Sequence, residues 1–481
     1  MFHFSSIENY HDGIREGSVT CLEAVEYYLG NIAAEQKLNA FVEVFRDEAM
    51  DKARAMDKAR TIGAPFKKLH GVVIAIKDVI CYKDHNISAA SGILQNFTSL
   101  YTASALQFLL DEDAIVIGNC NCDEFAMGSS NENSYYGNVL NAADNSRVPG
   151  GSSGGSAVAV QADMCMLSLG SDTGGSVRQP ADFCGIIGFK PSYGSISRYG
   201  LIAYASSFDQ IGIFGKNIAD VSLLFNIMKQ QDPMDTTMNV NTKPGVAAKG
   251  IKNNYRLCYF KQALEHPSLD PEIAASFRSL FSELRRDGHT VEEIEFDLLN
   301  YIVPTYYVLT TAEASSNLSR YDGIRFGHRT QSKAAELSDF YTANRSEGFG
   351  KEVKRRIMLG TFVLSAGYYD AYFEKAQIVR RMLSDQVKQI FQNFDAILSP
   401  TSPVPASKIG KVSQDPTEVY LADIFTVLAN LTGMPGISLP FFSHSYSIPY
   451  GLQIMTAKEE DVSLLGLSAS LLQRWKASQE T

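Results

Sequence analysis

The chain has 481 residues, of which 45% are hydrophobic and 20% are charged, a balance typical of a globular protein with a large core. A formal net charge of −10 argues against direct nucleic-acid binding, which needs clustered Lys and Arg. The seven cysteines are scattered and odd in number, which argues against a disulfide framework. There is no signal-peptide pattern and no run of about 18 apolar residues that could span a membrane. We therefore expect a cytoplasmic protein.

The first half of the chain alternates between helix and strand patterns. Thr20 and Glu23 have the spacing of a capping box, which predicts that a helix begins there. The patterns that follow predict a strand over 39–45, a helix over 47–60, a buried strand over 72–76, a helix over 105–112 and a buried strand over 114–117. This alternation predicts an α/β sheet.

The second half continues with a glycine- and serine-rich region, a polar stretch and then longer helices. A helix followed by a buried strand is expected between 158 and 169, and an exposed loop over 231–254. Helices are predicted over 271–286 and 369–394, and late strands over 396–398, 437–439 and 452–455. No repeat or linker divides the core.

Two glycine–serine clusters, 150–156 and 170–176, stand out. Such composition is typical of a flexible linker, but these clusters flank an apolar stretch, so glycine more plausibly allows close approach to a ligand. Neither cluster has the Gly-Lys-Ser/Thr ending of a phosphate-binding loop. Gly150–Gly154 also fits the G-x-S-x-G nucleophile elbow, which needs a strand before the turn and a distant histidine. Pro149 argues against that strand, and no downstream histidine stands in a setting that marks it as a base.

A lysine is the other side chain that could take a proton from a serine. Lys77 ends the apolar run 72–76, so its side chain should begin inside the protein, where burial favours the neutral amine. Most lysines are exposed and unreactive, but this position favours a base. Cys120 and Cys122 have the wrong spacing for a zinc or redox site, and we expect no metal.

The chain resembles the amidase signature family over nearly its whole length. The resemblance rests on five motifs in order, at 71–78, 150–156, 170–181, 185–193 and 206–212. That resemblance implies a mixed, twisted β-sheet covered by helices on both faces. It also implies a single amidase domain over 1–481, with an N-terminal helical part at about 1–65, a catalytic core at about 66–225, and a helical insertion with the remaining sheet at about 255–475.

The resemblance also assigns catalytic roles. It implies that Ser176 is the nucleophile, that Ser152, which in the family usually follows a cis peptide bond, is the bridging serine, and that Lys77 is the terminal base. The oxyanion is expected to bind to main-chain N–H groups at Thr173, Gly174 and Gly175 and at Ser176 itself, where glycine permits the tight turn.

Within the family, the chain most resembles one branch, the glutamine-hydrolysing A subunits of tRNA-dependent amidotransferases. Four further stretches carry this narrower resemblance, at 123–130, 313–327, 352–370 and 420–440. In that branch the ammonia passes to a B subunit, which activates misacylated tRNA with ATP and magnesium, while a small C subunit completes a heterotrimer. The chain itself would then need no cofactor. The segments 81–88 and 141–147 depart from the commonest forms and could alter the pocket rim or the partner surface.

The resemblance implies that glutamine is bound by Gly128, Tyr307, Arg356 and Asp423. Arg356 would hold the carboxylate, since its guanidinium can bind one bidentately, and Asp423 would hold the ammonium. The preceding residue, Arg355, matches the same sequence motif as Arg356. The alternative is a stand-alone amidase that acts on a small or apolar amide, which would need no charged clamp, and a catalytically dead scaffold is disfavoured because all three catalytic positions are filled.

Overall fold

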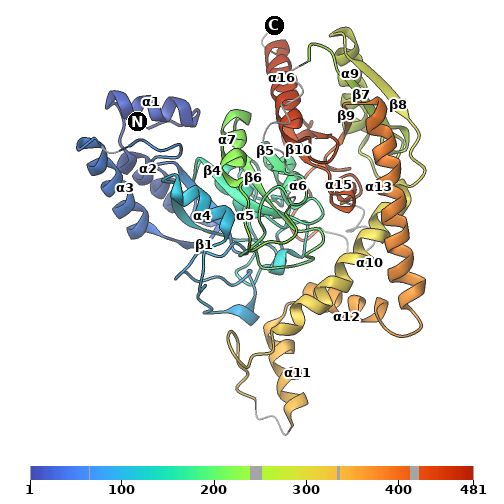
Figure 1. Ribbon diagram of the computed structural model, residues 1–481, viewed down its shortest axis with the longest axis horizontal. Helices are drawn as coiled ribbons and strands as arrows, with labels where there is room; N and C mark the ends of the chain where they lie inside the picture. The colour runs from blue at the N-terminus through green and yellow to red at the C-terminus, as the bar shows by residue number, and fades with distance from the viewer. Residues whose placement is uncertain (1, 64, 239–251, 333–335, 412–421, 480–481) are drawn as a thin grey trace.

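A single sheet of 11 strands organises the chain, with strand order β1-β3-β2-β4-β6-β5-β10-β11-β9-β7-β8 (Figure 1). The computed structural model describes residues 2–63, 65–238, 252–332, 336–411 and 422–479. The strands are β1 (Phe41–Val44), β2 (Val73–Lys77), β3 (Ile115–Cys120), β4 (Leu167–Asp172), β5 (Ile187–Lys190), β6 (Gln210–Gly215), β7 (Arg256–Phe260), β8 (Thr290–Ile294), β9 (Ala396–Pro400), β10 (Gly436–Ser443) and β11 (Pro449–Met455).

The sheet is mixed. Strand β2 runs parallel to β3 and β4, and β7 runs parallel to β8 and β9, whereas the other neighbouring pairs are antiparallel. Because β2 and β4 are parallel neighbours, their carboxyl ends lie at the same edge of the sheet. Those ends carry Lys77 and Asp172.

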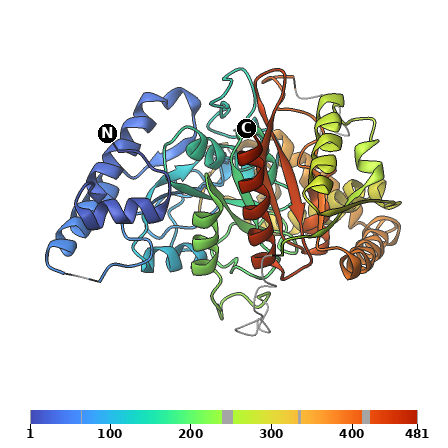
Figure 2. The ribbon, with the colours of Figure 1, turned by 90° about the horizontal axis from the view of Figure 1, so that it is seen from above.

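Helices cover both faces of the sheet (Figures 1 and 2). They are α1 (Ile7–Glu16), α2 (Cys21–Ala34), α3 (Arg46–Thr61), α4 (Ser104–Asp111), α5 (Gly154–Gln161), α6 (Arg178–Cys184), α7 (Ile218–Met228), α8 (Lys261–Leu264), α9 (Pro271–Arg286), α10 (Leu299–Asn317), α11 (Leu337–Gly348), α12 (Lys351–Val363), α13 (Lys375–Asn393), α15 (Val427–Thr432) and α16 (Asp461–Gln479). Helices α5 and α6 pack together against the central strands, and α7 and α16 form another pair that packs on β6 and β10.

Helices α10, α12 and α13 form a layer at one side of the molecule, and α10 packs on both of the others as well as on α15 (Figure 1). The short helix α15 therefore lies between this layer and the central strands. This arrangement matters for the site, because Tyr306 of α10 and Thr426 of the turn before α15 lie against Gly174, just after β4. Helix α12 reaches the same region through α10, on which it packs.

Most elements expected from the sequence are present. Thr20 and Glu23 form a complete capping box at the start of α2, and α9 has the predicted bounds. The helix expected over 369–394 is a π-helical turn, Asp370–Glu374, followed by α13. The polar stretch 231–254 lies largely outside the described residues.

Burial follows the apolar patterns. All five residues of β2 and all six residues of both β3 and β4 are buried. The apolar runs 72–76 and 114–117 predict this for β2 and the start of β3, whereas β4 also buries Ser168, Ser171 and Asp172. Cys120 and Cys122 are buried free thiols. Among the described helices, none is long and apolar enough to cross a membrane.

Candidate active site

Lys77 is completely buried at the end of β2. Its ammonium nitrogen, Nζ, lies 2.7 Å from the hydroxyl oxygen of Ser152, 2.9 Å from that of Ser153 and 2.9 Å from that of Ser171. Ser171 comes from β4, and the other two serines come from the turn before α5. The parallel pairing of β2 and β4 thus places the lysine among three neutral hydroxyl groups, none of which can compensate a full positive charge.

Burial lowers the pKa of Lys77 to about 8, although the carboxylates of Asp123 and Asp172 act in the opposite direction. A lysine with this pKa is partly neutral near pH 7 and can accept a proton. The structure thus supports the neutral amine that Lys77 needs in order to act as a base.

The hydroxyl groups around Lys77 are not equivalent. Ser153 donates its own proton to the carbonyl oxygen of Ser171, at 3.1 Å, so it can only accept from Lys77. No such acceptor is found for the Ser152 hydroxyl among the described contacts. A neutral lysine has two N–H donors and one lone pair. Ser153 and Ser171 can take the two donors, which leaves Ser152 to donate to the lone pair.

The turn that carries Ser152 is held by main-chain contacts. The Gly151–Ser152 peptide bond is cis, and the Gly151 N–H donates to the Gln179 side chain at 3.1 Å. No strand precedes this turn in the described chain, since residues 145–149 hold only an isolated bridge at Arg147. The strand that a nucleophile elbow needs is therefore missing, as Pro149 predicted.

Downstream histidines make contacts elsewhere. His289 accepts from the Tyr255 N–H, His328 contacts Glu347, and His444 lies beside Asp270 and Glu272. None of these contacts involves a serine of the two glycine–serine clusters. A lysine-based site is therefore the arrangement that the geometry favours.

Ser176 follows β4 and is 8% exposed, whereas Ser152 and Ser153 are fully buried. It is linked to the Ser152 turn through its main chain, because the Ser153 N–H donates to the Ser176 carbonyl oxygen at 3.3 Å. Of these three serines, Ser176 is therefore the one that a substrate can reach.

The turn between β4 and Ser176 is built around Asp172. Its buried carboxylate accepts the N–H groups of Gly175 at 2.9 Å and Val177 at 3.2 Å. It also forms a two-pronged ion pair with Arg178, at 3.0 and 3.1 Å. Burial acts to raise the pKa of Asp172, but the Arg178 guanidinium, helped by Lys190 and Asn430, lowers it to about 2. Asp172 thus remains an anion that fixes the turn.

The residues predicted for oxyanion binding lie in this turn, and their described contacts differ. The Gly175 N–H already donates to Asp172, so in this structure it is engaged by a carboxylate. The Thr173 hydroxyl donates to Asp209 at 2.7 Å. A Cβ atom at Gly174 would overlap the Tyr306 hydroxyl, which explains why glycine is needed there.

Arg356 and Arg355 differ in burial and in their contacts. Arg356 on α12 is 4% exposed. It donates to Glu352 at 2.9 Å and to the Tyr204 hydroxyl at 2.9 Å, and its guanidinium lies 5.3 Å from the centre of the Tyr307 ring. The Arg355 side chain is 41% exposed and contacts only the other oxygen of Glu352 among the described residues. The motif text could not distinguish the two arginines, but helix α12 does so by turning Arg356 inward.

Tyr307 joins this arginine to a carboxylate. Its hydroxyl donates to Asp423 at 2.8 Å, while its ring faces Arg356. Burial raises the pKa of Asp423 to about 6, against the opposing effects of Tyr307 and Arg356. Asp423 is therefore ionised at neutral pH. The structure brings a cation and an anion together beside the nucleophile turn, which suits a ligand that carries both charges.

Gly128, the remaining predicted substrate residue, lies in the loop after β3. A Cβ atom there would overlap the carboxylate of Asp123. Asp123 accepts the N–H groups of Asn131 and Asn133, and its own N–H donates to the carbonyl oxygen of Ser152 at 3.1 Å. Gly128 therefore allows its loop to lie against the segment that supports Ser152.

Sequence reasoning missed four residues of the site: Ser153, Ser171, Tyr204 and Glu352. The two serines belong to the glycine–serine clusters that the sequence singled out, and they contact Lys77 directly. Glu352 could have been found, because it stands one helical turn before Arg356. Tyr204 had no local signal, since it reaches Arg356 only through the tertiary fold.

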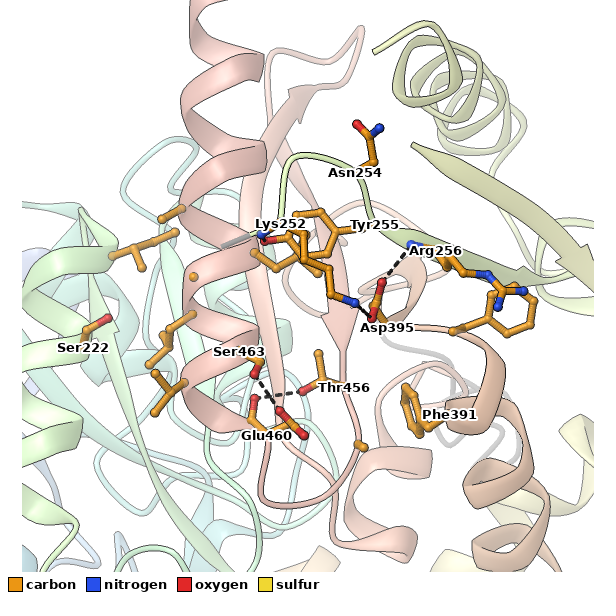
Figure 3. A pocket seen from close by; sticks show the side chains of 18 of the residues that line it. Ser222, Lys252, Asn254, Tyr255, Arg256, Phe391, Asp395, Thr456, Glu460 and Ser463 are labelled. Atoms are coloured by element: carbon orange, nitrogen blue, oxygen red, sulfur yellow. Dashed lines mark hydrogen bonds and ion pairs between the residues drawn. The ribbon is translucent and has the colours of Figure 1, made fainter. Parts of the chain in front are cut away.

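A pocket of about 840 Å³ lies away from these residues, between α7, the end of α13 and α16 (Figure 3). Lys252 and Asp395 form an ion pair of 2.6 Å at its wall. The lining contains none of the predicted catalytic or substrate residues. Within the described ranges, no group of three or more His, Cys, Asp or Glu residues could hold a metal ion.

Comparisons with known proteins match nearly the whole chain. The family model described as Amidase matches residues 23–465. The A subunit of glutamyl-tRNA(Gln) amidotransferase from Chlorobium phaeobacteroides is 46% identical over 478 residues, which cover 98% of this chain and 99% of that protein. The protein of the same name from Koribacter versatilis is 46% identical over 94% of both chains.

Solved structures give the same result. The crystal structure of the A subunit of glutamyl-tRNA(Gln) amidotransferase from Thermotoga maritima matches with a TM-score of 0.76 and 38% identity, over 94% of this chain and 93% of that one. A structure described as an amidase matches with a TM-score of 0.83 and 27% identity, over 98% of this chain and 100% of that one. With the buried lysine, the two serine turns and the family match along most of its length, this chain is a member of the amidase signature family.

Proposed function

We propose that this chain is the glutaminase subunit of a tRNA-dependent amidotransferase, which hydrolyses glutamine to glutamate and ammonia. The observation that carries the proposal is the presence of two features, the Lys77 hydroxyl cluster and the Arg356–Tyr307–Asp423 clamp, whose Asp423 turn contacts the nucleophile turn. The first supplies chemistry for an amide. The second provides the Arg356 cation for the carboxylate of free glutamine and the Asp423 anion for its ammonium group. The full-length similarity to the amidotransferase proteins supports the same assignment.

In the proposed reaction, neutral Lys77 accepts the Ser152 proton while Ser152 accepts the proton of Ser176. The Ser176 oxygen then attacks the side-chain amide carbon of glutamine. The developing oxyanion is bound by N–H groups of the 173–176 turn, with Gly174 and Ser176 favoured over Gly175. Loss of one such donor typically costs about 3 kcal/mol of transition-state stabilisation.

The proton then returns through Ser152 to the leaving ammonia as the carbon–nitrogen bond breaks. This leaves a glutamyl ester on Ser176. Water then attacks the ester carbon while Lys77 accepts its proton through Ser152, and that proton passes back to the Ser176 oxygen as the ester bond breaks. Glutamate is released, Ser176 regains its hydroxyl and Lys77 is neutral again. The chain needs no cofactor for these steps.

The ammonia is used by a B subunit, which converts Glu-tRNA(Gln) to the amidated form with ATP and magnesium; the same chemistry would serve Asp-tRNA(Asn). A small C subunit completes the heterotrimer. Because the net charge is −10, misacylated tRNA is held through the B subunit rather than by this chain. A role in amidating misacylated tRNA is compatible with the cytoplasmic location expected from the sequence.

Ser176→Ala tests the proposal in the reconstituted heterotrimer. We expect the variant to lose glutamine hydrolysis and glutamine-dependent amidation of Glu-tRNA(Gln), but to keep amidation driven by added ammonium. Equal loss of the ammonium-driven reaction would show that Ser176 is structural. Good turnover of apolar amides by the unmodified chain, with none of glutamine even beside its partners, would favour a stand-alone amidase.

A further inference from the structure

The turn before α15 contacts the nucleophile turn through one hydroxyl group. Thr426 is fully buried, and its hydroxyl donates to the carbonyl oxygen of Gly174 at 2.6 Å. A second acceptor, the carbonyl oxygen of Asp423, lies 3.1 Å away. The shorter contact is the one between the two turns, and a Cβ atom at Gly175 would overlap the same hydroxyl.

This contact fixes a peptide unit in the region expected to bind the oxyanion. The Gly174 carbonyl and the Gly175 N–H belong to one planar peptide. Thr426 holds its oxygen, and Asp172 accepts its N–H at 2.9 Å. With both ends held, and with Gly175 at a φ of +132°, this peptide restricts the orientation of the two peptides that flank it, which carry the N–H groups of Gly174 and Ser176.

The rest of the turn before α15 is anchored without the hydroxyl. The N–H groups of Thr426 and Val427 donate to the Asp423 carbonyl at 3.0 and 3.1 Å. The Thr426 carbonyl accepts from Arg178 at 2.7 Å, and the Phe425 carbonyl accepts from Gln453 at 2.8 Å. Removing the hydroxyl therefore leaves the turn in place and cuts its side-chain link to Gly174.

The same short turn carries the Asp423 carboxylate, which Tyr307 holds at 2.8 Å. We propose that Thr426 is a positioning residue that couples recognition of the substrate ammonium at Asp423 to alignment of the 174–175 peptide. This inference rests on the proposed function. Glutamine bound at Asp423 would stabilise the turn and, through Thr426, the oxyanion-binding geometry. Binding energy from a remote group would thereby raise kcat rather than only lower KM.

The test compares glutamine with glutaramate, which is glutamine without its amino group, in the heterotrimer. Thr426→Ala and Thr426→Val both remove the hydroxyl, and Thr426→Ser keeps it as the matched control. For glutamine, we expect kcat to fall by about 10²-fold in the Ala and Val variants, the scale of a misplaced reacting group, with KM nearly unchanged. For glutaramate, kcat should fall much less, and the Ser variant should restore glutamine turnover.

Equal losses of kcat on both substrates would overturn the coupling and leave Thr426 as a general support of the turn. A rise in KM for glutamine with unchanged kcat would also overturn it. If the Val variant fails to fold, the Ala and Ser variants decide the matter, with thermal unfolding as the check on folding. The unmodified heterotrimer is measured first, because absence of glutamine hydrolysis there would reject the proposed function itself.

Discussion

Burial decides the chemistry of Lys77. An ammonium group surrounded by three hydroxyl groups loses most of its hydration, and this loss lowers its pKa to about 8. The same side chain on the surface would be almost fully charged at neutral pH and could not accept a proton. The position of one residue at the end of a buried strand therefore sets its reactivity.

Replacement of Lys77 tests this account. We expect Lys77→Ala to lower kcat severely with the fold intact, and Lys77→Arg to be nearly as harmful, because a guanidinium does not lose its proton near neutral pH. In the unmodified enzyme the deprotonated lysine is the active form, so glutamine hydrolysis should increase as the pH rises through about 8. Stopped-assay ammonia measurements over about pH 6 to 10 would show this rise. An arginine variant with near-normal turnover would contradict the role.

Arg356 and Arg355 form a natural pair for testing the substrate clamp. Arg356 is buried against Tyr204 and Tyr307, so Arg356→Ala should raise KM for glutamine by orders of magnitude, since breaking a desolvated charge pair costs about 3–5 kcal/mol. A neutral amide such as butyramide should be affected much less. Steady-state kinetics with both substrates give the answer.

Arg355→Ala is the matched control for that experiment. Its side chain is 41% exposed, so its loss should change neither substrate's kinetics greatly. Both arginines contact Glu352, so the comparison isolates the inward guanidinium. If Arg356→Ala lowered turnover of glutamine and butyramide equally, Arg356 would have a structural role.

At the scale of elements, the end of β4, the start of α6 and the turn before α15 are held together by one buried ion pair. Asp172 and Arg178 are both fully buried. Arg178 also donates to the Thr426 carbonyl and to Gln453, each at 2.7 Å, and Asn430 donates to Asp172 at 2.9 Å. This network connects the strand that carries the nucleophile turn to the helix that follows Asp423.

We therefore expect Arg178→Met to destabilise the fold strongly. It leaves the Asp172 carboxylate buried without its partner, which typically costs about 3–5 kcal/mol. Urea unfolding monitored by circular dichroism measures the change. The matched control is Arg381→Met, because the Arg381–Asp385 pair is 75% and 47% exposed and such pairs contribute about 0–1 kcal/mol. Similar losses of stability in both variants would show that the buried ion pair contributes no more to stability than the exposed pair.

At the scale of the whole molecule, the proposed function assigns metal-free hydrolysis of glutamine to this chain and metal-dependent amidation of tRNA to the B subunit. The described part of the chain has no cluster of metal-ligating side chains, and the proposed hydrolysis uses only Lys77, Ser152 and Ser176. We expect EDTA to leave glutamine hydrolysis by the heterotrimer unchanged and to abolish ATP-dependent amidation of tRNA. Parallel assays of glutamate release and amidated tRNA give the two readouts. Loss of hydrolysis under EDTA that zinc restores would contradict the proposed mechanism.

The sequence by itself determined the elements whose signals are local. Continuous apolar runs identified β2 and the start of β3, since strands buried on both faces are rich in apolar residues. The apolar stretch 158–169 predicted only the beginning of β4, whose last residues are polar. The capping box identified the start of α2. The motif order identified the family, and with it Lys77, Ser152 and Ser176 as candidates.

The tertiary structure decided everything that depends on residues far apart in the chain. Only strand pairing brings Ser171 to Lys77, and only the packing of α12 shows that Arg356, not Arg355, is buried. The structure also assigned the Gly175 N–H to Asp172 and joined Thr426 to Gly174. The physical reason is that hydrogen bonds and desolvation depend on distances of a few ångströms, and local sequence patterns fix periodicity but not which segments come into contact.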